Sequence, residues 1–337
     1  MEHITTGLLI FLLIVSGFII WICGIQLSKV TDYIDKKYNL GDAFGGLIIL
    51  SIVTNLPEIA IIISGAIRHD LSLASGNILG GIAVQTVVLV ILDFYCGKKS
   101  KPLSTLASSK QTILEGVLVI AILSITLIGS QLKNEPMMFH SSPSELLILI
   151  TWVVGLLIIN KVSKKSKTEN QNSVVNIEIL KKFTPISAFI WLFITASATL
   201  FCGVLMEQSS SIIAHRMHID GVIFGATILA LLTSLPELST GIASIKFKDY
   251  QLATGDIFGG NAFLPVLFLL ASLISGENIL AQCTKSDMYL TTIGILLTAI
   301  YVVGLILKSS KKMVGIGIDS FVVLILYVFS ILGLMFI

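Results

Sequence analysis

This sequence of 337 residues has few charged side chains. Asp, Glu, Lys and Arg make up 12% of it, about half of the roughly 25% that a soluble domain carries. Hydrophobic residues make up 55%, and they gather in apolar runs of about 18 residues or more, each long enough to cross roughly 30 Å of hydrocarbon. The scarcity of charge excludes an ordinary soluble domain and predicts an all-α polytopic membrane protein.

Several enzyme and metal signatures are also missing. The cysteines Cys23, Cys96, Cys202 and Cys283 have no paired or metal-type spacing, so neither a disulfide framework nor a cysteine metal site is predicted. There is no H-E-x-x-H pattern for a zinc enzyme. The first apolar run lacks a basic n-region and a small-residue cleavage site, so we expect a retained helix rather than a signal peptide.

Charge is distributed unevenly between the two sides of the predicted membrane protein. One long hydrophilic linker, residues 161–183, separates five expected spans from five more. If this linker is cytoplasmic, only Arg68, Lys133, Arg216 and Lys285 of the 22 Lys and Arg residues lie outside. The positive-inside rule then places both termini outside, in what we expect to be the plasma membrane. The ten expected spans are residues 6–27, 43–66, 73–96, 112–131, 145–160, 184–206, 221–245, 251–275, 288–307 and 314–336.

A short motif occurs twice, 179 residues apart. TNLPE at residues 54–58 returns as TSLPE at residues 233–237. Five spans in each half, an odd number, give the two copies opposite orientations, and inverted repeats are common in transporters. A duplicated structural bundle without a transport role is the simpler alternative. The halves are residues 1–160 and 184–337, and the repeated units within them cover about residues 43–96 and 221–275.

Each motif places a carboxylate beside an expected break in a membrane helix. Pro57 offers no N–H to the carbonyl of Val53, and Thr54 lies one helical turn from Glu58. Backbone oxygens left free at membrane depth need a polar occupant, and Ca²⁺ accepts six to eight oxygen ligands. We therefore predict a metal-ion site at the two glutamates; protonated structural glutamates are the alternative. The second copy of this arrangement consists of Leu232, Thr233, Pro236 and Glu237.

The second part of each repeat is punctuated by glycine. GNILGGIAVQ covers residues 76–85 and GDIFGGNAFL covers residues 255–264. Asn77, Gln85 and Asp256 are polar side chains at membrane depth, which favours a role in the site. Small residues also let another helix approach closely. The glycines expected to serve such packing are Gly80, Gly81, Gly259 and Gly260.

These two copies resemble the alpha-repeats of the cation/Ca²⁺ exchanger superfamily, which includes sodium/calcium and calcium/proton antiporters. The family pattern, roughly G-T-S-x-P-E followed by G-N-x-x-G-S-N-I-x-N, is similar to TNLPE with GNILGG and to TSLPE with GDIFGGN. The resemblance implies that Glu58 and Glu237 coordinate the transported cation and that the first helix of each half moves. It further implies backbone oxygen from Thr54 and Thr233, a lining of Asn55 and Ser234, and an amide ligand from Gln85.

The departures from the family pattern concern sodium. Gly81 and Gly260 replace serines that help bind sodium in the family, and Leu264 stands at the last polar position of the second repeat, whereas Asp256 adds an acid. The predicted function is exchange of Ca²⁺, or a similar cation, for Na⁺ or H⁺ by alternating access. Inorganic cations and the lipid bilayer are the expected partners, and neither a cofactor nor nucleic acid is expected.

Two other classes of protein fit parts of the pattern. A passive cation channel could use the same ligands. A measurement of counter-transport would distinguish an exchanger from a channel. ATGD at residues 253–256 resembles the G-x-G-D of membrane aspartyl proteases, but Ala253 replaces the first glycine. Such an enzyme also needs a second aspartate near the membrane midplane, whereas Asp93 and Asp319 lie towards span ends. Three more acids near span ends are expected to face headgroups or water: Glu115, Glu145 and Glu207.

Overall fold

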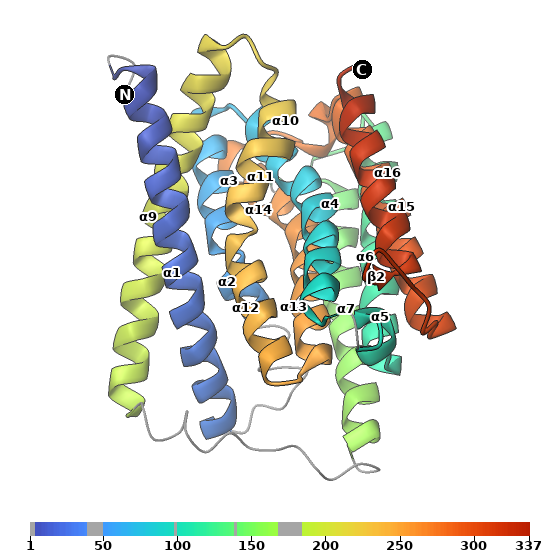
Figure 1. Cartoon of the computed structure of the whole chain (residues 1–337). Coiled ribbons are helices and arrows are strands. Elements are labelled where there is room, and N and C mark those ends of the chain that lie inside the picture. Colours follow the sequence, from blue (N-terminus) through green and yellow to red (C-terminus); the bar gives the residue numbers. More distant parts are fainter. Residues whose placement is uncertain (1–3, 39–49, 98–99, 138–139, 168–183) are drawn as a thin grey trace.

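The computed structural model is almost entirely helical (Figure 1). It describes residues 4–38, 50–97, 100–137, 140–167 and 184–337. In this part, eight helical segments are long and apolar enough to cross a membrane. They are Thr6–Thr31, Ser72–Tyr95, Lys110–Gln131, Pro143–Ser163, Pro185–Arg216, Gly221–Lys246, Tyr250–Ser275 and Lys285–Leu307.

The all-helical fold class is confirmed, whereas ten spans remain a prediction. The start of the expected second span, residues 43–49, lies outside the described residues. The expected tenth span corresponds to helix α16, Ile318–Leu334, whose 17 residues are fewer than the eight longer segments have.

The N-terminal half contains four long helices and three shorter ones in the described residues. Its elements are α1 (Thr6–Tyr38), α2 (Leu50–Thr54), α3 (Leu56–Arg68), α4 (Ser72–Tyr95), α5 (Leu103–Leu106), α6 (Lys110–Gln131) and α7 (Pro143–Lys167). Helix α7 continues seven residues into the stretch expected to be a linker, and residues 168–183 lie outside the described part.

The C-terminal half has more interruptions. Its elements are α9 (Pro185–Arg216), α10 (Gly221–Phe224), the π-helical turn η2 (Gly225–Leu229), α11 (Ala230–Thr233), α12 (Leu235–Lys246), α13 (Tyr250–Phe263), the 3₁₀ turn η3 (Leu264–Val266), α14 (Leu267–Ser275), the 3₁₀ turn η4 (Leu280–Gln282), α15 (Lys285–Leu307), the paired strands β1 (Lys312–Met313) and β2 (Ile316–Gly317), and α16.

Polar side chains at the helix starts explain several of these boundaries. Ser109 accepts a hydrogen bond from the Thr112 amide at the start of α6, over 3.0 Å. Thr284 and Asp287 form a reciprocal capping box at the start of α15, which satisfies amides that have no partner within the helix. These caps help to end the loops and start the helices at defined residues.

The long helices α1 and α9 lie side by side along one flank, and α15 and α16 lie on the opposite flank (Figure 1). Helices α4, α12 and α13 lie between these flanks. The first turn of α1 and the last turn of α16 are at one end of the molecule, and the last turn of α7 and the first turn of α9 are at the other. Which end faces the cytoplasm remains a prediction from the charges.

The two motif-bearing segments run in opposite directions (Figure 1). The chain rises from α2 into α3 in this view, whereas it descends from α11 into α12. Each segment is interrupted at its motif, because α2 ends at Thr54 before α3 begins at Leu56, and α11 ends at Thr233 before α12 begins at Leu235.

Helix α4 crosses α10 and η2 at backbone distance. A Cβ atom at Gly76 would lie 2.3 Å from the Val222 carbonyl oxygen, and one at Gly80 would lie 2.3 Å from the Ala226 Cα. Helices gain no hydrophobic driving force from each other inside lipid, so close van der Waals packing of small residues holds them together. This crossing joins the two halves of the chain in the middle of the molecule.

The sequence also predicts close packing at Gly81, and the structure differs there. A Cβ atom at Gly81 would meet nothing nearer than the Leu264 Cδ1, at 3.9 Å. Gly80 faces the α10–η2 backbone, and the next residue is turned about 100° away from it around the helix. Gly259 lies buried in α13.

Three acids expected to face headgroups or water are buried instead. Glu115, Glu145 and Glu207 have exposed fractions of 2%, 0% and 0%. Glu207 accepts hydrogen bonds from Ser64 over 2.6 Å and from Arg68 over 3.3 Å. Position near a span end does not say whether a side chain faces the membrane surface or a neighbouring helix, and these three face helices.

Replacing Gly80 by Ala should destabilise the protein more than the same change at Gly81. The added methyl group at position 80 collides with backbone atoms of η2, and overpacking of this kind costs about 1–3 kcal/mol. Gly81→Ala adds the same methyl group one residue further on, where it has room. Unfolding of the purified variants in detergent would measure both effects, and equal stabilities would contradict the proposed crossing.

Candidate cation-binding site

The two helix breaks have the same local geometry. Asn55 and Ser234 are the single residues between the paired helices, with φ,ψ of −87°, 16° and −80°, 3°. The side-chain nitrogen Nδ2 of Asn55 donates to the Ser51 carbonyl over 2.6 Å, and the Ser234 hydroxyl donates to the Ala230 carbonyl over 2.8 Å. At each break, the side chain therefore donates a further hydrogen bond to a carbonyl of the preceding turn that already accepts the backbone N–H of the same residue.

The threonine before each break reaches into the opposite half of the chain. Thr54 Oγ1 donates to Asp256 Oδ1 over 3.4 Å, and Thr233 Oγ1 donates to Asn77 Oδ1 over 3.2 Å. Asp256 and Asn77 occupy equivalent positions in the two repeats, 179 residues apart. These crossed contacts bring both motifs and both glycine-rich helices into one cluster.

The two motif glutamates lie within this cluster, where they are buried and have no hydrogen-bond partner. Glu58 and Glu237 have exposed fractions of 1% and 0%. All four of their carboxylate oxygens are without a hydrogen-bond partner in the part of the chain that the structure describes. Thr233 is a neighbour of Glu58, Thr54 is a neighbour of Glu237, and the two glutamates are near enough for their charges to interact.

Helix ends supply part of the electrostatic environment. Glu58 and Glu237 lie in the first turns of α3 and α12, where the positive end of the helix dipole favours a negative side chain. The carbonyl ends of α2 and α11 stop at the same breaks, and such ends favour a cation. The sequence predicts free carbonyls at Val53 and Leu232, but the Leu232 carbonyl accepts a backbone N–H at the break, so the prediction is wrong there; a free carbonyl at Val53 remains a prediction from the position of the proline.

Two amide side chains add further oxygens on one side of the cluster. A Cβ atom at Gly260 would lie 2.7 Å from Asn55 Nδ2 and 3.4 Å from Gln85 Oε1, so these three residues meet. The side-chain oxygens of Asn55 and Gln85 are buried without a hydrogen-bond partner among the described residues. The corresponding place in the other repeat has Gly81 beside Leu264, which offers no oxygen.

Two polar residues in the cluster are absent from the sequence prediction. Thr240 donates to Asp256 Oδ2 over 2.6 Å, so both oxygens of that acid are held by threonines. Asn261 is fully buried, its amide reaches the Ile82 carbonyl over 3.5 Å, and its side-chain oxygen has no hydrogen-bond partner in the described residues. Thr240 lies three residues after Glu237 on α12, a spacing that would have marked it as a neighbour of the acid.

The cluster is closed, and it combines carboxyl, amide and hydroxyl groups rather than acids alone. Within the described ranges, no three His, Cys, Asp or Glu side chains group closely enough to hold a metal ion. A cation bound here would therefore need amide, hydroxyl or backbone oxygens in addition to the two glutamates. Every side chain that the sequence assigns to cation binding is at most 2% exposed, so the conformation is occluded.

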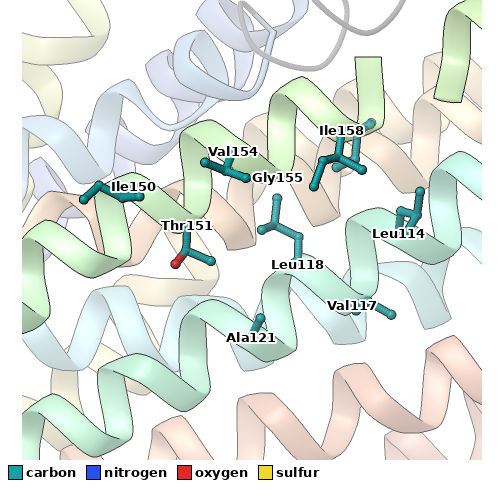
Figure 2. A pocket seen from close by; sticks show the side chains of 10 residues that line it. Leu114, Val117, Leu118, Ala121, Ile150, Thr151, Val154, Gly155 and Ile158 are labelled. Carbon is teal, nitrogen blue, oxygen red and sulfur yellow. The ribbon is translucent and has the colours of Figure 1, made fainter. Parts of the chain in front are cut away.

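Two cavities of the described chain lie elsewhere. Figure 2 shows an apolar groove of about 330 Å³ between α6 and α7, lined by side chains such as Leu118, Val154 and Ile158. A smaller cavity of about 230 Å³ lies near His69 and Asp287. Neither contains a motif residue, so neither is the cation site.

The fold and the paired buried acids at broken helices define a membrane protein of the ion-transport class. The sequence profile described as "Sodium/calcium exchanger protein" matches residues 8–168 and 187–336. The chain therefore belongs to the sodium/calcium exchanger family and is an integral membrane protein.

Two individual relatives are identical to this chain at about a quarter of the aligned positions. The chain is 24% identical over 272 residues to "Inner membrane protein YrbG" of Escherichia coli K12, covering 79% of this chain and 80% of the relative. It is 25% identical over 258 residues to "Putative antiporter CaxA" of Alkalimonas amylolytica, covering 76% and 77%.

Solved structures share the fold. The H⁺/Ca²⁺ exchanger CAX superimposes with a TM-score of 0.67 at 13% identity, covering 97% of this chain and 87% of that one. The sodium-calcium exchanger NCX_Mj superimposes with a TM-score of 0.61 at 16% identity, covering 98% and 100%.

Replacing Thr240 by Val should lower the free energy of unfolding by about 1–3 kcal/mol, because Asp256 Oδ2 would lose its donor in a buried place. Thr292→Val is the matched control, because Thr292 is exposed and its hydroxyl bonds only within its own helix. Chemical unfolding in detergent without divalent cations would compare the two variants. An equal loss in both would mean that the bond to Asp256 contributes nothing.

Proposed function

We propose that this protein exchanges Ca²⁺, or a similar hard divalent cation, for protons across the membrane. The observation that carries the proposal is the pair of buried glutamates whose four oxygens have no hydrogen-bond partner in the described residues. Burying an ionised carboxylate without a partner is very costly. A divalent cation between Glu58 and Glu237 would neutralise both charges.

The number and kind of oxygens support a hard cation. Beside the four carboxylate oxygens, Asn55 and Gln85 each hold one buried side-chain oxygen without a partner in the described chain. These six oxygens, with backbone oxygen at the breaks, match the six to eight oxygens that Ca²⁺ accepts. Soft metal ions prefer sulfur, and the motif residues supply none.

Protons are the counter-ion that these side chains support best. Without a cation, two neighbouring carboxylates repel each other, and a proton on either one relieves the repulsion. Cation and protons would then compete for the same oxygens, which couples the two fluxes. Sodium would need further oxygens, but Gly81 and Leu264 offer none on one side of the cluster.

Alternating access would expose this one site to each side in turn. The occluded state has both motifs closed around the acids, and movement of α1 and α9 relative to the rest of the protein would open it. We further propose ten spans as two inverted five-helix units. The termini would lie outside the plasma membrane and the linker within the cytoplasm.

Proteoliposomes containing the protein should take up ⁴⁵Ca²⁺ when an outward proton gradient is imposed. Glu58→Gln and Glu237→Gln should each lower uptake by at least about tenfold, since losing a group that merely supports a metal ligand already costs about 10- to 100-fold in affinity. Glu277→Gln is the control, because Glu277 is half exposed at the surface and pairs with His69.

An outward sodium gradient forms the second arm of this experiment. Uptake driven by sodium alone would replace protons as the counter-ion while keeping cation exchange. If ⁴⁵Ca²⁺ enters without an opposing gradient and the accumulated ion leaks out freely, the result would instead indicate a channel. If neither gradient drives uptake of a divalent cation, the exchanger proposal is wrong for this chain.

Equilibrium binding can be tested without transport. Ca²⁺ at about 100 times its dissociation constant should stabilise the detergent-solubilised protein by about 2.7 kcal/mol. The stabilisation should shrink as the pH falls, because protons compete for the two glutamates, and it should vanish in Glu58→Gln. A thermal shift that is independent of pH and unchanged in Glu58→Gln would contradict binding at this site.

A further inference from the structure

Each of the two long helices touches a motif proline through a glycine. A Cβ atom at Gly24 of α1 would lie 2.8 Å from the Pro236 Cβ and 3.0 Å from its Cα. A Cβ atom at Gly203 of α9 would lie 2.9 Å from the Pro57 carbonyl oxygen and 3.2 Å from its Cα. Real side chains are not accommodated at such distances without movement, so the helices can lie against the prolines only because both residues are glycine.

The two contacts are equivalent and crossed. Gly24 and Gly203 are 179 residues apart, the same separation as the motifs, and each follows a cysteine in the sequence. The glycine of the first half contacts the motif of the second half, and the reverse holds for the other glycine. Helices α1 and α9 also pack along each other (Figure 1). The two helices therefore contact both breaks as one packed pair.

The contact points lie directly next to the cation-binding acids. Pro57 precedes Glu58, and Pro236 precedes Glu237, so a displaced proline displaces the carboxylate that follows it. A Cβ atom at Gly17 of α1 would lie 3.1 Å from the Leu232 Cδ2, on the other side of the same break. Helix α1 thus contacts residues both before and after the break at Ser234.

We propose that Gly24 and Gly203 are positioning residues of the cation site: each lets a long helix lie against the motif proline of the opposite repeat, which holds the neighbouring glutamate in binding geometry. This inference rests on the proposed function for its effect on cation affinity. The physical reason is that ligands bind tightly only when surrounding residues hold them in place. Both glycines act through the prolines and would not touch the ion.

The crossed geometry can be tested without any cation. Hydrogen–deuterium exchange of the full chain in detergent would compare Gly24→Ala and Gly203→Ala with the wild type. Gly203→Ala should speed exchange by about fivefold or more around residues 54–60, in the first motif, because the added methyl group forces that break to open more often. Gly24→Ala should do so around residues 233–239, in the second motif.

Two controls separate this effect from a general loss of packing. At Gly129 a Cβ atom would lie 2.7 Å from the Ser144 Cβ, between α6 and α7, whereas Gly7 of α1 has nothing within 4 Å. Gly129→Ala should lower stability without speeding exchange selectively in either motif. Gly7→Ala should change neither the stability nor the exchange of the motifs. Exchange that changes only within the mutated helix, or equally in both motifs, would overturn the crossed contacts.

Cation affinity provides the second readout. Gly24→Ala and Gly203→Ala should raise the KM for ⁴⁵Ca²⁺ uptake by about tenfold or more with a smaller change in maximal rate, since a misplacement of about 1 Å can cost as much as 10²-fold at a preorganised site. An unchanged KM beside an active wild type would overturn the positioning role. An inactive wild type would instead refute the proposed function, and the exchange pattern would still decide the crossed contacts.

Discussion

The structure depends on two buried carboxylates in an apolar protein, near enough for their charges to interact. Glu58 and Glu237 have no hydrogen-bond partner among the described residues, and acidic side chains inside a membrane protein are rare because their burial is costly. The surrounding features all reduce the free-energy cost of burying these two acids. Both acids lie in the first turn of a helix, threonine hydroxyl groups lie beside them, and each helix is interrupted next to its acid.

The site is built by exchange between the two halves of the chain. Thr54 bonds to Asp256 and Thr233 bonds to Asn77, so each motif is completed by the glycine-rich helix of the other half. The long helices extend the same pattern, since each lies on the proline of the opposite motif. Neither half contains a complete site, and small residues at the crossings allow the halves to come close enough to form one.

The symmetry of the site is incomplete, and this has chemical consequences. On one side, the amides of Asn55 and Gln85 meet at Gly260, whereas the equivalent place has Gly81 beside Leu264. One side of the cluster is therefore rich in oxygen and the other is apolar. Under the proposed function, this asymmetry favours one divalent cation shared by both glutamates over additional monovalent ions.

The sequence by itself determined the membrane class, the two motifs, a helix break within each motif and the glutamate that ends it. These follow from local rules, because hydrophobic run length, a missing proline N–H and a repeated motif can be read along the chain. Tertiary structure alone decided which residues meet. The bond from Thr240 to Asp256, the buried position of Glu115 and the crossed contact of Gly203 with Pro57 depend on how helices far apart in sequence face each other, and no periodicity within one helix specifies its neighbour.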